Sequence, residues 1–226
     1  FSLTAQQPEN NITRTAYQAM SAVLGGTQSL HTNSMDETLA LPSEKAVEIA
    51  LRTQQILAYE TGVCNVVDPL GGSWYVESLT NQMEKDANEY FDKIDKLGGV
   101  VECIESGFFQ KEISDSAQIF NNKVENNDRI IVGVNDFIKK DEEIDIPILE
   151  IDETVQTYQE EKLNNIIKNR NNDKVDVKLK AITKACENND NLVPLIIDAA
   201  LEYATLGEIV ESMKVVFGEW QEKSII

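Results

Sequence analysis

The chain has 226 residues, of which 42% are apolar, 26% charged and 7% aromatic, so it is long enough to bury a hydrophobic core. Its 20 basic and 39 acidic residues give a net charge of −19, which argues against nucleic acid as a partner because no surplus of cations remains to bind phosphates. No apolar run is long enough for a membrane span, and three scattered cysteines fit a reducing compartment, so we expect a cytoplasmic protein with buried thiols.

The first part of the chain predicts a helix, a strand and a second helix. Apolar residues recur at helical spacing over residues 11–24, and Gly25 and Gly26 end the pattern. Residues 27–32 alternate with a period of two, which predicts a short strand. Ser43 is suited to cap a helix that continues to Thr61. This order is typical of an α/β architecture with parallel strands.

The remainder of the chain is predicted to be mainly helical. A compact apolar run at residues 129–135 predicts a buried strand, and the acidic residues 136–147 predict a linker. Thr205 and Glu208 have the spacing of a capping box. Helices are expected at residues 76–97, 112–127, 153–168, 177–186 and 194–204, with a last one after Thr205.

The sequence therefore divides into an α/β piece, residues 1–61, and a mainly helical piece, residues 62–226. The first residue is Phe1 rather than Met, and a motif-dense stretch follows it at once. We therefore expect the sequence to be part of a longer chain.

A candidate ligand site follows the first predicted strand. The carboxyl ends of strands are where α/β barrels and open α/β sheets place their ligand sites. On spacing alone two interpretations stay open: a ligand site, or ordinary solvated acids beside a histidine that is satisfied in the core. A histidine-cluster zinc site is excluded within this chain because His31 is its single histidine. The polar residues concerned are His31, Thr32, Asn33, Asp36 and Glu37.

Several ordered motifs resemble the large, catalytic subunit of the coenzyme-B12-dependent acyl-CoA mutases, the methylmalonyl-CoA mutase family. The clearest is Thr-Gln-Ser-Leu-His-Thr-Asn at residues 27–33, followed by Asp36-Glu37 and by Leu-Ala-Leu-Pro at residues 39–42. The resemblance covers nearly the whole chain. It continues through Val-Asp-Pro at residues 67–69, Gly-Gly-Ser-Trp-Tyr-Val at 71–76, Ile-Val-Gly-Val-Asn at 131–135 and Ala-Thr-Leu-Gly-Glu at 204–208.

The resemblance implies an eight-stranded α/β (TIM) barrel followed by a helical linker region. On that template Phe1 follows the seventh strand, and residues 27–32 are the eighth strand. Residues 1–61 are then the last helix-strand-helix units of the barrel, and residues 62–226 are the linker or docking region. Seven strands and the residues that hold the CoA thioester are missing, so we expect the fragment to be inactive by itself.

The resemblance also implies a cofactor and a reaction. The cofactor is adenosylcobalamin, and the reaction interconverts methylmalonyl-CoA and succinyl-CoA by a radical rearrangement of the carbon skeleton. Carried over by position, Asn33 and Glu37 face the adenosyl group, with Glu37 accepting hydrogen bonds from the ribose hydroxyls. Ala40 lines the corrin face, and Phe1 takes the place of an aromatic residue, usually Trp. No catalytic residue or metal ligand is assigned, and Gln28 and His31 match the motif without a role.

The implied partners are an acyl-CoA substrate, the rest of the barrel and a separate small cobalamin-binding subunit, in a homo- or hetero-oligomer. The small subunit is expected because no Asp-x-His-x-x-Gly cobalamin motif follows within the chain. Two alternatives stay open. In the first, the helical region is a structural docking module for that subunit. In the second, the enzyme is a mutase whose substrate is another acyl-CoA, such as isobutyryl-CoA or 2-hydroxyisobutyryl-CoA.

Overall fold

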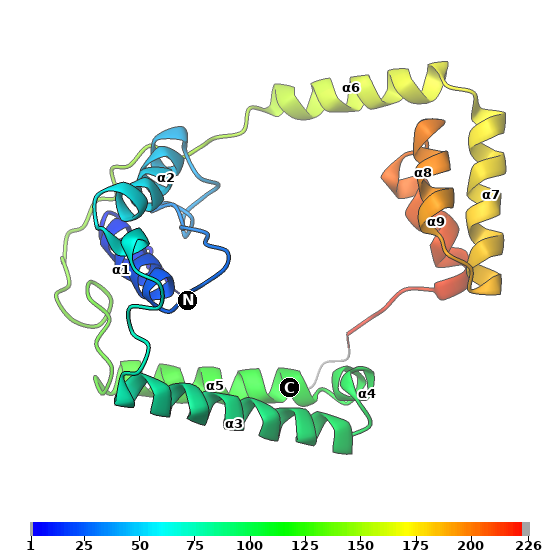
Figure 1. Ribbon diagram of the computed structural model, residues 1–226. Helices are drawn as coiled ribbons and strands as arrows, with labels where there is room; N and C mark the ends of the chain where they lie inside the picture. The colour runs from blue at the N-terminus through cyan, green and yellow to red at the C-terminus, as the bar shows by residue number, and fades with distance from the viewer. Residues whose placement is uncertain (1, 223–226) are drawn as a thin grey trace. The chain divides into compact units, whose positions relative to one another are not determined.

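The computed structural model describes residues 2–222 (Figure 1). Their backbone forms two compact units that divide between Glu150 and Ile151, and each is described by itself. This boundary separates compact regions of the chain, whereas the predicted boundary at residue 61 separates a barrel from a linker. The boundary at residue 61 therefore stays a prediction.

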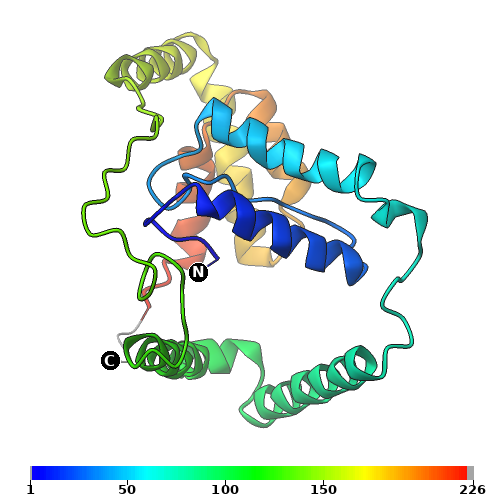
Figure 2. The ribbon, with the colours of Figure 1, turned by 90° about the vertical axis from the view of Figure 1, so that its left-hand side faces the viewer.

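The first unit begins with two helices, α1 (Asn10–Leu24) and α2 (Glu44–Tyr59), which pack side by side (Figure 2). Both were predicted. The Ser43 side chain accepts a hydrogen bond from the Ala46 backbone and so caps α2, as its residue type indicates. Ala19, Ala46 and Ala50 are buried, and their small side chains suit a close approach of backbones. The segment between the helices carries the candidate site.

The predicted strand at residues 27–32 is wrong for this structure. The segment runs without helix or strand, and within residues 2–222 no ladder partner lies beside it. A strand needs a neighbour to satisfy its backbone hydrogen bonds, and an alternating pattern cannot supply one. The expected eight-stranded barrel consequently stays a prediction about a larger assembly.

After the short 3₁₀ turn η1 (Val63–Asn65), the first unit continues with α3 (Trp74–Lys96), α4 (Val100–Glu105) and α5 (Phe108–Glu125). Sequence reasoning found α3 and α5 but missed the short α4. Gly98 and Gly99 end α3 with φ angles of 105° and 102°, which favour glycine. No residue of α3 is buried, and Trp74 is 94% exposed.

The second predicted strand, residues 129–135, is also wrong. A tight turn replaces it, with an isolated bridge between Val132 and Asp136. The Asn135 side chain holds this turn: its Oδ1 accepts from Ile131 N at 2.7 Å, and its Nδ2 donates to Arg129 O at 2.7 Å. These local side-chain bonds compete with a strand ladder. The irregular linker predicted at residues 136–147 is confirmed.

The second unit consists of α6 (Glu153–Asn169), α7 (Asn172–Asn188), α8 (Val193–Leu201) and α9 (Leu206–Phe217). All four were predicted, although α7 begins earlier than expected. Helix α7 packs against α8 and α9 around a buried apolar cluster. The cluster consists of Ile182, Cys186, Ala199 and Ile209. Cys186 and Cys103 are buried as expected, but Cys64 is exposed.

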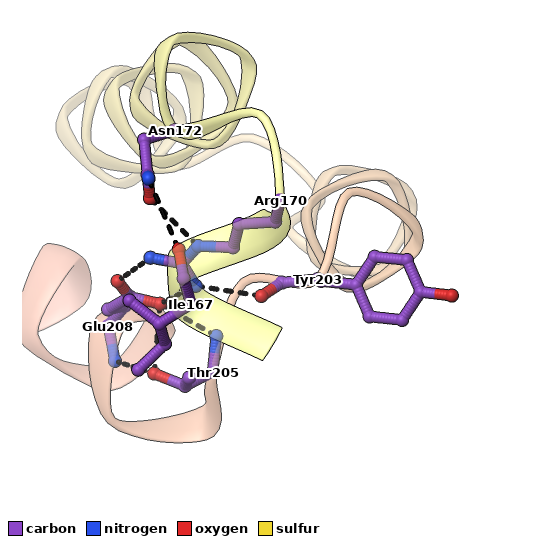
Figure 3. A network of polar contacts seen from close by, with 6 residues as sticks. All are labelled: Ile167, Arg170, Asn172, Tyr203, Thr205 and Glu208. Atoms are coloured by element: carbon purple, nitrogen blue, oxygen red, sulfur yellow. Dashed lines mark hydrogen bonds and ion pairs between the residues drawn. The ribbon is translucent and has the colours of Figure 1, made fainter. Parts of the chain in front are cut away.

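A polar clasp, formed by Arg170, Tyr203, Thr205 and Glu208, closes the second unit (Figure 3). The Arg170 guanidinium forms a two-point ion pair with Glu208 and donates to Tyr203 O at 2.8 Å. The predicted capping box of Thr205 and Glu208 is confirmed and shares the same carboxylate. The Arg170 guanidinium, together with the Thr205 bonds, lowers the pKa of Glu208 to about 2.

Over residues 2–222, no helix is both long enough and apolar enough to cross a membrane.

Candidate functional site

The candidate site is the loop of residues 33–43, between the segment predicted as a strand and α2. Its centre is the Glu37 carboxylate. Asn33 Nδ2 donates to Oε2 at 2.6 Å, and Ser34 N donates to Oε1 at 2.7 Å. His31 Nε2 lies 3.9 Å from Glu37 Oε1. The structure therefore brings together Asn33 and Glu37, the two residues that were predicted to face one ligand.

Glu37 keeps hydrogen-bonding capacity for a ligand. A carboxylate has about four acceptor positions, and the Asn33 and Ser34 bonds use one on each oxygen. The side chain is 26% exposed, so part of it remains in contact with solvent. A fixed carboxylate of this kind binds hydroxyl pairs well, because its orientation is set before the ligand arrives.

The other predicted residues differ in their surroundings. Ala40 is half-buried, and its N–H donates to Asp36 O at 3.1 Å. Gln28 is exposed. The side chain of His31 is 79% exposed, so the interpretation of a satisfied core histidine is wrong. Phe1 lies outside the described residues.

Asp36 is not a solvated loop acid, because it is fully buried. Its Oδ2 accepts from Ser43 N at 2.9 Å, and its backbone oxygen accepts from the N–H groups of Leu39 and Ala40. Asp36 Oδ1 has no hydrogen-bond partner among the described residues. The carboxylate thus links the candidate loop to the residue that caps α2.

Helix α2 fixes the segment that precedes the loop. Thr32 Oγ1 donates to Ala50 O at 2.7 Å, and Gln54 Nε2 donates to Thr32 Oγ1 at 3.1 Å and to Leu30 O at 3.2 Å. Sequence reasoning missed Gln54. Its signal would have been a polar residue within the apolar stripe of an amphipathic helix.

Helix α1 fixes the loop from the other side through Asn11, to which sequence reasoning assigned no role at this site. Asn11 Nδ2 donates to Met35 O at 2.9 Å, and Thr15 Oγ1 donates to Asn33 O at 3.4 Å. Both side chains are buried at the face of α1 that meets the loop. The available signal in the sequence was weaker: Asn11 and Thr15 lie at four-residue spacing in line with Ala19, an apolar position of the helix.

Comparison with known proteins assigns the family. The family model "Methylmalonyl-CoA mutase" matches residues 1–219. The chain is 42% identical to the 2-hydroxyisobutanoyl-CoA mutase large subunit of Aquincola tertiaricarbonis, over 99% of this chain and 40% of that protein. It is 41% identical to the methylmalonyl-CoA mutase of Escherichia coli strain K12, over 97% of this chain and 31% of that protein.

A third relative is the methylmalonyl-CoA mutase large subunit of Porphyromonas gingivalis, with 42% identity over 98% of this chain and 31% of that protein. The chain therefore spans 31–40% of the length of these relatives. Because the family model and the relatives cover nearly all of this chain, the chain belongs to the methylmalonyl-CoA mutase family.

Proposed function

We propose that this chain is the C-terminal part of the catalytic subunit of an adenosylcobalamin-dependent acyl-CoA mutase. The family assignment supports an acyl-CoA mutase. The observation that carries the cofactor proposal is the partly exposed Glu37 carboxylate, which Asn33 and Ser34 orient through one hydrogen bond to each oxygen.

In this proposal the loop of residues 33–43 holds the adenosyl end of the cofactor. Glu37 accepts hydrogen bonds from the ribose hydroxyls, and Asn33 keeps the carboxylate in place. Ala40 and Phe1 line the corrin face. The cofactor supplies the radical chemistry when it is bound, and these side chains bind it, orient it and exclude water.

The rest of the enzyme completes the site. Residues 27–32 pair with further strands as the eighth strand of an eight-stranded α/β barrel, and residues 62–226 form a linker that contacts a separate small cobalamin-binding subunit. Two of the relatives are named as large subunits, which supports a divided enzyme. The fragment alone is inactive, since it lacks the residues that hold the CoA thioester.

The proposed reaction is the interconversion of methylmalonyl-CoA and succinyl-CoA. Relatives named for methylmalonyl-CoA and a relative named for 2-hydroxyisobutanoyl-CoA are 41–42% identical to this chain, so 2-hydroxyisobutyryl-CoA is the alternative substrate, with isobutyryl-CoA beside it. Turnover of each acyl-CoA by the assembled mutase separates them.

The second candidate function is a structural docking module for the cobalamin subunit. The observation that favours it is α3, on which Trp74, Met83 and Phe91 are exposed. If docking is the main role, changes at these exposed side chains weaken subunit association, whereas changes at Glu37 leave cofactor binding unchanged.

The test of the cofactor proposal is Glu37→Gln in the complete assembled mutase. This change keeps the shape and removes the charge, and charge-assisted hydrogen bonds contribute about 1.5–3 kcal/mol. We expect adenosylcobalamin to bind about ten- to a hundredfold less tightly, since 1.4 kcal/mol is about one factor of ten.

Two controls make this result specific. Cobalamin without the adenosyl group should bind Glu37→Gln and the unchanged enzyme equally. Glu48→Gln removes an exposed carboxylate of α2 that forms an ion pair with Arg52, and it should change neither affinity. Unchanged adenosylcobalamin affinity in Glu37→Gln would refute the assignment.

A further inference from the structure

Asn11 uses the full hydrogen-bonding capacity of its side chain. The residue is 0% exposed, in the first turn of α1. Its Nδ2 donates to Thr4 O at 2.8 Å and to Met35 O at 2.9 Å. Its Oδ1 accepts from Thr4 N at 3.1 Å and from Arg14 Nη1 at 2.9 Å. Two donors and two acceptors are all that an amide side chain has.

One side of this arrangement fixes the segment that precedes α1. Asn11 pairs with both backbone groups of Thr4, as a neighbouring strand would. Arg14 Nη1 also donates to Thr4 Oγ1 at 2.9 Å, and Thr38 Oγ1 donates to Thr4 O at 3.2 Å. Thr4 is therefore attached both to α1 and to the candidate loop.

The other side fixes the backbone that orients Glu37. Asn11 holds the carbonyl of Met35, and Thr15 holds the carbonyl of Asn33. Ser34 lies between those two residues, and its N–H donates to Glu37 Oε1. The donor that positions the Glu37 carboxylate therefore belongs to a peptide segment that α1 restrains on both sides.

We propose that Asn11 is a positioning residue for the cofactor site. It joins the segment around Thr4 to the loop that carries Asn33 and Glu37, and it acts on the ligand through Glu37 without touching it. This inference rests on the proposed function, because the affected property is binding of the adenosyl group.

The chemistry requires an amide at this position. Asn11→Asp keeps the size and the Oδ1 acceptor but places an oxygen against the carbonyls of Thr4 and Met35. Neither carbonyl can donate a hydrogen bond, so both contacts become repulsive in a buried setting. Asn11→Ala removes the four bonds without adding that repulsion, and it serves if Asn11→Asp does not fold.

The matched control is Asn10→Asp. Asn10 is the neighbouring residue, and its Nδ2 donates to the Gln7 side chain at 3.0 Å rather than to Thr4 or the candidate loop. The chemical change is the same, but neither Thr4 nor the candidate loop loses a partner. We expect Asn10→Asp to bind adenosylcobalamin within twofold of the unchanged enzyme.

The experiment measures adenosylcobalamin affinity of the assembled mutase in a double-mutant cycle. We expect Asn11→Asp to bind about tenfold less tightly, with little effect on cobalamin that lacks the adenosyl group. If Asn11 acts through Glu37, Asn11→Asp combined with Glu37→Gln loses little more than Glu37→Gln alone. Losses that multiply, or no loss in the Asn11 variants, would overturn the proposal.

Hydrogen exchange separates failure of this inference from failure of the proposed function. The Asn11 variants should accelerate amide exchange in peptides covering residues 3–6 and 33–37 but not in α2. Faster exchange with unchanged cofactor affinity in both Glu37→Gln and the Asn11 variants would refute the proposed function and the role at the cofactor site together. Unchanged exchange, with a Glu37→Gln defect present, would refute Asn11 alone.

Discussion

The candidate loop and the second unit are held together by different forces. The second unit packs α7 against α8 and α9 over a small apolar cluster, with one clasp between Arg170 and Glu208 (Figure 3). The loop of residues 33–43 depends on single hydrogen bonds from side chains of α1 to its backbone. The segment before the loop is bonded to α2 through Thr32 and Gln54. Apolar packing tolerates small adjustments, whereas each such bond fixes one atom. The hydrogen bonds of the loop therefore fix the positions of its atoms, whereas the apolar packing of the second unit mainly stabilises that unit.

Of the substitutions that test this comparison, Ile182→Ala should lower stability the most. Ile182 is fully buried at the centre of the apolar cluster, and truncating a buried Ile to Ala costs about 2–5 kcal/mol. We expect the free energy of unfolding of residues 151–222 to fall by about 3 kcal/mol in urea. Val177→Ala, at an exposed position of α7, is the control and should cost well under half as much. Equal losses would show that the cluster is not the core.

Arg170→Met should have the next largest effect. The Arg170 side chain is 5% exposed, and removing one partner of a buried ion pair leaves the other charge unpaired. Methionine keeps much of the aliphatic volume, so the change isolates the charge. Because Glu208 is one-third exposed, we expect a loss of about 2 kcal/mol in urea unfolding. Lys111→Met, which breaks an exposed ion pair with Asp115, should change stability little. No loss in Arg170→Met would mean that packing alone holds this unit.

Acid should weaken the clasp over a defined pH range. Folding lowers the pKa of Glu208 from 4.5 to about 2, mainly through its hydrogen bonds with Arg170. The resulting stabilisation is complete above the unfolded pKa and is lost as the pH falls from about 4.5 towards 2. Partial exposure limits the loss to about 1–2 kcal/mol. Glu208→Gln should remove this part of the pH dependence, and an unchanged acid profile in that variant would contradict the assignment.

Thr32→Val should have the smallest effect on stability but a local effect on the loop. The change keeps the branched shape and removes the bonds of Thr32 Oγ1 with Ala50 O and Gln54 Nε2. A typical bond of this kind contributes about 1 kcal/mol. Amide exchange should accelerate at residues 30–37 and stay unchanged in α7. Uniform acceleration across both units would show that the loop does not respond separately.

The helices could be predicted from the sequence, because their signals are local. Apolar spacing predicts α1, α2, α3 and α6, and residue types predict the Ser43 cap and the Thr205–Glu208 capping box. The pairing of Asn33 with Glu37 joins residues four positions apart, so it too lies within reach of a local pattern. Each of these features depends on atoms within one or two turns of the chain.

Tertiary structure decided the remaining features. The alternating residues 27–32 form no strand, because a strand depends on neighbours that are distant in sequence. The burial of Asp36 and the four bonds of Asn11 depend on the meeting of α1, the loop and the start of α2. An acid in a loop and an amide at a helix start look the same in sequence whether buried or solvated. Only packing removes the water and makes each hydrogen bond a requirement.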